Sequence, residues 1–271
     1  RLQNAVTAWH DVFGANDAEF ADRIRGDRID ILFDLAGHAP GNRLPVFARR
    51  PAPIQITWID SVGTTGLAAI DYVLADRCQI PAGHESFYCE RVLRMSDCYV
   101  CYDPPDYAPP VGPLPSAANS RVTFAAFHNP AKIQPPVVRL WGEILRRVPG
   151  SHLLLKYRGM EVGAVADRIR QMFSAAGVGT DRVEFEPPSP HAELLAAYNR
   201  TDITLDPLYN GGLTTCESLW MGVPVVTCPG ETFASRHSLS HTTNAGFTET
   251  IACALAGYVA IAVRLASNRP R

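Results

Sequence analysis

Residues 202–235 read DITLDPLYNGGLTTCESLWMGVPVVTCPGETFAS, and this stretch decides the fold of the chain. An apolar run ends at Asp206, and a polar turn with two glycines, Gly211 and Gly212, follows it. Thr214 then opens an amphipathic run, and a second apolar run covers residues 223–228. This order predicts a strand, a glycine-rich turn, the start of a helix and a second strand.

The turn in this stretch has the features of an anion site. Backbone N–H groups in the first turn of a helix lack intrahelical partners, and the helix dipole adds partial positive charge there. Gly211 and Gly212 would let a phosphate approach the main chain closely. Glu217, one turn into the helix, is placed to accept a hydrogen bond from a sugar hydroxyl. The alternative interpretation is an ordinary strand–helix turn capped by Thr214.

Length and composition limit the classes of protein to consider. The chain has 271 residues, enough for one large or two modest domains. A net charge of −2 argues against a nucleic-acid partner and against an anionic membrane surface. The seven cysteines are scattered, and there is neither a signal peptide nor an apolar run of about 18 residues. We therefore expect a reduced, soluble, cytoplasmic protein with no membrane partner.

Two residue types stand out against this background. Lysine occurs only at positions 132 and 156, although the sequence holds 25 lysines and arginines together. A lysine in a loop is therefore a candidate functional residue, whereas Lys156, near the end of a predicted strand, serves as the neutral comparison. Cys98 and Cys101 have the spacing of metal ligands, but no second pair completes a site, so no metal centre is predicted.

The amino-terminal part of the chain, residues 1–102, shows an alternating pattern. Apolar runs of buried-strand length alternate with short helical stretches, and loops rich in Gly, Thr and His follow the runs. The pattern predicts a parallel sheet whose loops lie at the carboxyl edge. Three strands are few for a doubly wound domain, so we expect this Rossmann-like lobe to be incomplete at its amino end. The predicted helices cover residues 17–27 and 45–50, and the strands 29–35, 53–58 and 70–75.

Residues 103–120 hold six prolines and little apolar periodicity, which predicts a linker between two domains. The remainder, residues 121–271, predicts a doubly wound α/β domain with three loops at its ligand-binding edge, 128–132, 187–191 and 210–215. No dinucleotide fingerprint or Walker A sequence occurs in the chain. The predicted strands cover residues 121–127, 152–157, 182–185, 203–206 and 224–228, and the helices 135–147, 162–177, 191–199 and 215–221.

Several short motifs occur in one order along the chain, and together they resemble the catalytic region of the protein O-GlcNAc transferases, glycosyltransferase family 41. The resemblance is to the bacterial type that follows tetratricopeptide repeats, and it covers about residues 17–265. The motifs are RPAPIQ (50–55), GTTG (63–66), DY (71–72), NPAKI (129–133), YNGG (209–212), LWMGVP (219–224) and ASR (234–236).

The resemblance implies a fold and an activity. It implies two Rossmann-like lobes of the GT-B type and a donor substrate, UDP-GlcNAc, used without metal or cofactor. N-acetylglucosamine would pass with inversion to Ser or Thr hydroxyls of an acceptor protein. The full-length chain would also carry tetratricopeptide repeats.

The resemblance also implies roles for individual residues. Lys132 would place its ammonium on the departing diphosphate, where charge develops in the transition state. Asn129 would lie near the same diphosphate, and Glu217 would bind the ribose hydroxyls. The donor segments implied by the resemblance are the phosphate cradle Gly212, Leu213 and Thr214 and the uracil segment Ser189, Pro190, His191 and Leu194.

The chain departs from the family pattern at three places, which bear on donor affinity rather than on the fold. Leu213 stands where a threonine is usual, and Leu194 stands where a uracil-side histidine is common. The segment 206–209 is one residue shorter than usual. The family's catalytic histidine falls before the first residue of this chain, and His38 matches a position facing the acceptor. The alternative interpretation is that His38 only forms a hydrogen bond to the backbone of its loop.

The first functional expectation is therefore an inverting transferase that moves N-acetylglucosamine from UDP-GlcNAc to proteins, in a fragment or short form. Another UDP-sugar enzyme, such as a hexose transferase or a UDP-GlcNAc 2-epimerase, is the second hypothesis. A non-catalytic UDP-binding or scaffold module is the third, because the first lobe is expected to be incomplete. The sequence leaves the acceptor proteins and the oligomeric state open.

Overall fold

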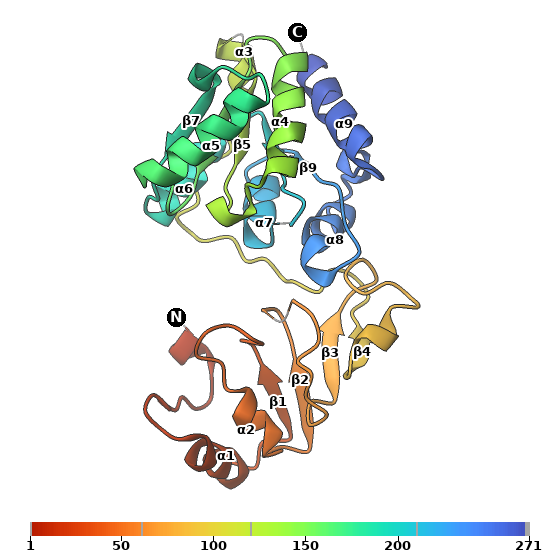
Figure 1. Ribbon diagram of the computed structural model, residues 1–271. Helices are drawn as coiled ribbons and strands as arrows, with labels where there is room; N and C mark the ends of the chain where they lie inside the picture. The colour runs from red at the N-terminus through yellow and green to blue at the C-terminus, as the bar shows by residue number, and fades with distance from the viewer. Residues whose placement is uncertain (1, 61, 120, 210, 269–271) are drawn as a thin grey trace. The chain divides into compact units, whose positions relative to one another are not determined.

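The chain forms two compact units, Arg1–Tyr99 and Val100–Arg271, each built around its own parallel sheet (Figure 1). The computed structural model describes residues 2–60, 62–119, 121–209 and 211–268. Asn210 of the YNGG motif therefore lies outside the described residues. The two units are described separately below.

The first unit holds a sheet of four parallel strands in the order β1-β2-β3-β4. Three of the strands were predicted, and the fourth was missed because its sequence, RVLR, holds only two apolar residues between two arginines, too short an apolar run to indicate a strand. The strands are β1 (Ile31–Asp34), β2 (Ile54–Thr57), β3 (Tyr72–Ala75) and β4 (Arg91–Arg94), and the helices are η1 (Leu2–Ala5), α1 (Asp17–Gly26), α2 (Leu44–Ala48) and η2 (Glu85–Phe87).

Local chemistry explains where the elements of this unit begin and how they are joined. Asn16 caps α1 by accepting the N–H groups of Ala18 and Glu19, and Glu19 bonds the Asn16 N–H in return. The RPAPIQ and DY motifs are connected to each other by hydrogen bonds and an ion pair. The buried Gln55 amide donates to two backbone carbonyls, while Asp71 accepts both the Gln55 N–H and the Arg50 guanidinium at 2.8 and 2.7 Å.

The second unit holds five parallel strands in the order β7-β6-β5-β8-β9. The chain runs from β5 outward through β6 to β7, and then returns to the other side of β5 for β8 and β9. The strand order therefore reverses between β5 and β8. All five strands were predicted, and they are β5 (Thr123–Ala126), β6 (His152–Lys156), β7 (Val183–Glu186), β8 (Ile203–Leu205) and β9 (Val225–Val226).

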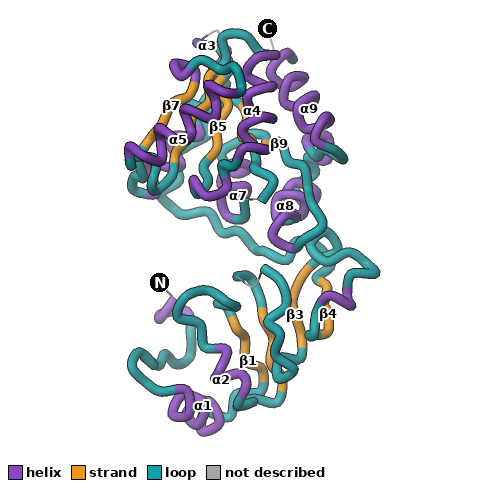
Figure 2. Tube along the Cα trace, viewed as in Figure 1, coloured by secondary structure: helices purple, strands orange, loops and turns teal. Residues whose placement is uncertain are grey.

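Helices cover both faces of this sheet. The helices α4 (Pro135–Arg147), α5 (Gly163–Ala175) and α9 (Leu255–Ser267) lie side by side over one face (Figure 2), while α6 (His191–Tyr198) and α7 (Leu213–Trp220) pack on the other. None of the helices in the described part of the chain has the length and apolar composition to cross a bilayer. The remaining helical segments are α3 (Pro115–Asn119), η3 (Pro130–Lys132), η4 (Thr180–Arg182), η5 (Phe233–Ser235), α8 (His237–Asn244) and η6 (Thr248–Thr250).

Alternation along β5 divides the core between these two layers. Phe124 and Ala126 belong to the cluster under α4, α5 and α9, whereas Ala125 and Phe127 belong to the cluster under α6 and α7. This is the period of two that a strand covered on both faces requires. The fully buried Trp141 donates its indole N–H to the Tyr258 hydroxyl at 3.0 Å.

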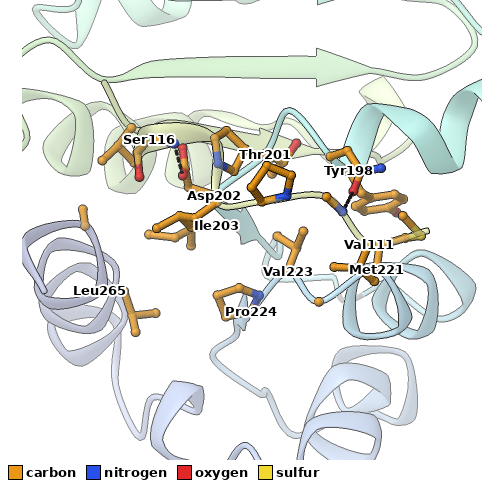
Figure 3. A pocket seen from close by; sticks show the side chains of 18 of the residues that line it. Val111, Ser116, Tyr198, Thr201, Asp202, Ile203, Met221, Val223, Pro224 and Leu265 are labelled. Carbon is orange, nitrogen blue, oxygen red and sulfur yellow. Dashed lines mark hydrogen bonds between the residues drawn. The ribbon is translucent and has the colours of Figure 1, made fainter. Parts of the chain in front are cut away.

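The proline-rich segment predicted as a linker is tied to the second unit. Asn199 accepts the Gly112 N–H at 2.8 Å, and Asp202 accepts the N–H groups of Ser116 and Thr123 at 2.8 and 2.7 Å. Figure 3 shows Asp202 against Ser116 in a cavity of about 330 Å³. This cavity lies where β5, β8 and β9 begin, at the edge of the sheet opposite the one expected to bind ligands.

We expect Asp202→Ala to destabilise the second unit, because it leaves two buried N–H groups without their acceptor. The cost should be about 2–4 kcal/mol in the free energy of unfolding, measured by urea denaturation. Asp167→Ala, which removes an exposed ion pair with Arg170 on α5, should cost under about 0.5 kcal/mol. Equal costs for the two variants would show that Asp202 does not hold the segment in place.

Candidate functional site

Two buried titratable side chains flank the point where the strand order of the second sheet reverses. His128 lies two residues beyond β5, and Asp206 directly follows β8. Open α/β sheets bind their ligands at the carboxyl ends of the strands, at such a reversal. The His128 Nε2 atom lies 3.8 Å from the Asp206 Oδ1 atom, and both side chains are almost completely buried.

Asp206 is held by donors on both carboxylate oxygens. Its Oδ1 atom accepts the Gly211 N–H at 2.8 Å, and its Oδ2 atom accepts the Thr227 hydroxyl at 2.8 Å. Burial raises the pKa of Asp206 to about 6, although these hydrogen bonds and the charge of Lys132 act in the opposite direction. Buried groups with strongly shifted pKa values are common at functional sites, so Asp206 is a candidate member of one.

Lys132 and His128 share this environment. Lys132 ends the short helix η3, and burial lowers the pKa of its ammonium while the charge of Asp206 raises it. Burial lowers the pKa of His128 to about 3, and the positive charge of Lys132 acts in the same direction. The imidazole is therefore neutral near pH 7, and Lys132 provides the positive charge of the cluster.

Helix α7 begins in this cluster with an open amino terminus. Its N-cap is Gly212, which supplies no side-chain cap, and Leu213 is its first residue. The capped turn considered from the sequence is therefore wrong, because Thr214 lies inside the helix. The Thr214 hydroxyl lies 3.5 Å from His128 Nδ1. The N–H groups of this first helical turn can therefore donate hydrogen bonds to an anion, as the glycine-rich sequence predicts.

The two glycines of the turn have different roles. A Cβ atom on Gly211 would lie 2.6 Å from His128 Cε1 and 2.6 Å from Thr214 Oγ1, so no other residue fits there without displacement. A Cβ atom on Gly212 would meet no heavy atom within 4 Å. Gly211 is thus required for packing, whereas Gly212 leaves its side of the main chain open.

A cavity of about 430 Å³ lies at the same edge of the sheet and contains four of the predicted site residues. The Ser189 hydroxyl is buried there, with no hydrogen-bond partner in the described part of the chain. Buried polar atoms are normally paired, so this hydroxyl is available to a ligand. The predicted residues that line the cavity are Asn129, Ser189, Leu194 and Thr214, and the others are Phe127, Lys156, Tyr157, Arg158 and Pro188.

Lys156 is not the neutral comparison that its sequence position predicted. It lies 3.3 Å from the carboxylate of Glu186 and donates to the Pro187 carbonyl at 3.0 Å. Like Tyr157 and Arg158, it lines the cavity but was not among the predicted site residues. The sequence could have identified all three as site residues, because they lie at the end of a predicted strand, on the ligand-binding edge of the sheet. His128 and Asp206 carried the same signal at the ends of β5 and β8.

Glu217 and His191 are brought together. Glu217 is 1% exposed, and its Oε1 atom lies 2.7 Å from His191 Nε2, while the Tyr198 hydroxyl lies 3.4 Å from Oε2. The other ring nitrogen of His191 lies 2.8 Å from the Tyr107 hydroxyl. A residue predicted to bind ribose and one predicted to bind uracil thus form one hydrogen-bonded network.

The remaining predicted residues lie at the margins of the site or in the other unit. The Asn129 side chain accepts the Ala131 N–H at 2.9 Å and so shapes the turn that carries Lys132. Pro190 is the N-cap residue of α6, and Leu213 is 61% exposed. His38 belongs to the first unit, where its Nε2 atom lies 3.2 Å from the Thr64 carbonyl oxygen.

Metal-ligand clusters do not occur among the residues that the structure describes. No group of three or more His, Cys, Asp or Glu side chains within those ranges lies close enough to hold an ion. No disulfide joins any of the seven cysteines, all of which lie in the described part of the chain.

Two Rossmann-like units with parallel sheets define an α/β protein of the GT-B type, as the sequence predicted. A family model described as glycosyl transferase family 41 matches residues 12–107 and 113–271. The chain therefore belongs to glycosyltransferase family 41.

Similar proteins agree with this assignment. The chain is 38% identical over 262 residues to the probable UDP-N-acetylglucosamine–peptide N-acetylglucosaminyltransferase SPINDLY of Arabidopsis thaliana, covering 96% of this chain and 29% of that protein. It is 33% identical to the Arabidopsis protein SEC, which has the same enzyme description, covering 100% of this chain and 28% of that protein. The chain thus spans less than a third of the length of these relatives.

Solved structures resemble the chain as well. A variant of the Thermobaculum terrenum O-GlcNAc transferase superposes with a TM-score of 0.92 at 37% identity, covering 98% of this chain and 51% of that one. A trehalose-6-phosphate synthase superposes with a TM-score of 0.51 at 12% identity, covering 92% and 71%, which shows a shared fold only.

We expect the two glycines of the turn to respond differently to alanine. Gly211→Ala must displace His128 or Thr214 and should cost about 1–3 kcal/mol in the free energy of unfolding. Gly212→Ala has open space and a negative φ, so it should change stability by less than about 0.5 kcal/mol. Thermal denaturation of both variants tests the difference, and equal stabilities would contradict the packing role of Gly211.

Proposed function

We propose that the protein is an inverting glycosyltransferase that moves N-acetylglucosamine from UDP-GlcNAc to Ser and Thr hydroxyls of proteins. One observation carries the proposal: the open amino terminus of α7, the bare main chain at Gly212, the Thr214 hydroxyl and the Lys132 ammonium all belong to one edge of the second sheet. This is a site for a diphosphate. The names of the relatives supply the sugar and the acceptor.

In this proposal residues 121–271 form the donor-binding lobe. The diphosphate lies at the start of α7, where backbone N–H groups and the Thr214 hydroxyl donate to it. Uracil enters the cavity beside Ser189 and Leu194, and the ribose hydroxyls donate to Glu217. The buried hydroxyl of Ser189 supports the uracil position, because it is a polar group without a partner among the described residues that a nucleoside can pair.

In the chemical step, the role of Lys132 is to stabilise the negative charge that develops on the leaving diphosphate. An acceptor hydroxyl oxygen attacks the anomeric carbon from the face opposite the leaving group, and the bonding electron pair of the anomeric C–O bond departs with the β-phosphate. The negative charge that develops there is stronger than in the bound donor. A preorganised ammonium therefore stabilises the transition state more than the ground state. His38 of the first unit remains the candidate to face the acceptor and its departing proton.

Two further parts of the proposal concern the whole protein. The full-length chain carries tetratricopeptide repeats that select acceptor proteins, as the family resemblance implies. The protein acts in the cytoplasm, a proposal that rests on the scattered positions of its seven cysteines in the sequence.

Product analysis with labelled UDP-GlcNAc separates this activity from the alternatives. Incubation of the protein with candidate acceptors should place N-acetylhexosamine on Ser or Thr, located by mass spectrometry. Conversion of the donor to its 2-epimer would assign the chain to the epimerases instead. Binding of UDP without turnover in the full-length protein would favour a scaffold.

We expect UDP to bind in the absence of a divalent metal. Ammonium and backbone N–H groups supply the positive charge that a metal would otherwise bring to the diphosphate. Calorimetric titration of UDP into the protein, with and without EDTA, checks this. Affinities should agree within about twofold, which is under 0.5 kcal/mol, and loss of binding with EDTA would refute the proposal.

We expect Lys132→Ala to lower kcat by about a hundred- to a thousandfold, the usual effect of removing a preorganised transition-state donor. Lys132→Arg should restore the rate only in part, because a planar fork replaces a compact point charge. Arg139→Ala, which removes an exposed cation from α4 of the same unit, is the control and should leave kcat unchanged. If kcat of Lys132→Ala stayed within about threefold of the parent, far from the expected loss, the proposed role of Lys132 would be wrong.

A further inference from the structure

The carboxylate of Asp206 lies between two parts of the anion site. One oxygen accepts the Gly211 N–H, so the carboxylate fixes the turn from which α7 starts. The carbonyl of Gly211 is held as well, because the hydroxyls of Thr215 and Ser238 donate to it at 3.0 and 3.1 Å. Both backbone polar groups of Gly211 are thus hydrogen-bonded within the protein. The Gly211 N–H donates to Asp206 and is not available to a ligand.

The surroundings of Asp206 are mostly neutral. From β5 it faces His128, and from α9 the hydroxyl of Tyr258 donates to its backbone carbonyl at 2.8 Å. The Thr227 hydroxyl reaches it from the end of β9. Lys132 is the group of opposite charge that acts on it from η3. The positive charge that lowers the pKa of Asp206 thus belongs to the lysine that the proposed reaction requires.

We propose that Asp206 is a positioning residue of the anion site: its buried carboxylate fixes the Gly211 turn and keeps the Lys132 ammonium charged. The inference rests on the proposed function only for the identity of the anion. A hydrogen-bond acceptor alone could hold the turn, and an asparagine oxygen would do so. The negative charge has a separate purpose, because Lys132 is half-buried and burial favours its neutral form.

The presence of only two lysines allows the charge on Lys132 to be measured directly. Protein labelled with 13C at lysine Cε should give two side-chain signals, and Lys156→Arg identifies the Lys132 signal by elimination. Titration without ligand should show a Lys132 midpoint below the ordinary lysine value. In Asp206→Asn, which keeps the shape of the side chain, we expect that midpoint to fall by about one pH unit or more.

Two controls separate the charge from the fold. Asp206→Glu retains the charge and should retain a midpoint closer to the parent than to Asp206→Asn. Thr227→Val removes a hydrogen bond to Asp206 without removing its charge, so it should move the midpoint by less than about a third of the Asp206→Asn shift. A Lys132 midpoint in folded Asp206→Asn that matches the parent within about 0.3 unit, far below that expected shift, overturns the proposal.

Stability gives a second measurement that does not depend on the lysine signal. The pKa of Asp206 is raised in the folded protein to about 6, so its contribution to stability is complete below about 3.8 and is lost as the pH rises through about 6. The parent should therefore lose stability relative to Asp206→Asn between about pH 4 and pH 6. A stability difference independent of pH would show that Asp206 carries no buried charge and would also overturn the proposal.

UDP binding connects the positioning role to the proposed function. In the parent, affinity should fall at alkaline pH as Lys132 loses its proton, and in Asp206→Asn the fall should begin at lower pH by the shift seen in the lysine titration. If UDP does not bind to the parent, the proposed function fails while the lysine titration still decides the role of Asp206. If UDP binds with identical pH profiles in both proteins, the positioning role fails while the function stands.

Discussion

The pairing of β5 with β8 is the interaction on which the site depends. Phe124 lies opposite Ile203 and Ala125 opposite Thr204, in strands nearly eighty residues apart in the sequence. This pairing is where the strand order of the second sheet reverses, and loops that leave the two strands must diverge to opposite faces. The glycine turn, Lys132 and the start of α7 all lie on the segments that follow these two strands. Without this register, the residues of the site would belong to unrelated loops.

Buried polar groups at the two edges of the same sheet differ in whether they have hydrogen-bond partners. At the amino edge, both oxygens of Asp202 accept backbone N–H groups, so the carboxylate serves structure alone. At the carboxyl edge, the Ser189 hydroxyl and His128 Nε2 are buried without hydrogen-bond partners in the described ranges. Buried polar atoms of this kind cost stability unless a ligand pairs them. The contrast distinguishes the ligand-binding edge from the edge that only attaches the proline-rich segment.

Local sequence patterns predicted most elements of the fold because periodicity and helix boundaries are short-range properties. Helix α4 matches its predicted bounds, residues 135–147, since its apolar spacing is regular and prolines mark its start. Strand β4 was not predicted because this edge strand has only two apolar residues, Val92 and Leu93, between two arginines. The predicted residues Asn129, Ser189, Leu194 and Thr214 line one cavity because each follows a strand or opens a helix at the same edge. Such positions can be recognised in a sequence once the strands are assigned.

The sequence by itself determined the fold class, the family resemblance and the set of loops that could bind a nucleotide sugar. Only the tertiary structure decided which side chains in those loops meet. It pairs Glu217 with His191, places His128 against Asp206, and turns Lys156 into a buried member of the cavity. The physical reason is that composition and spacing act along the chain, whereas burial, desolvation and charge pairing act across it. Those interactions exist only after strand order has brought distant segments within a few ångströms of one another.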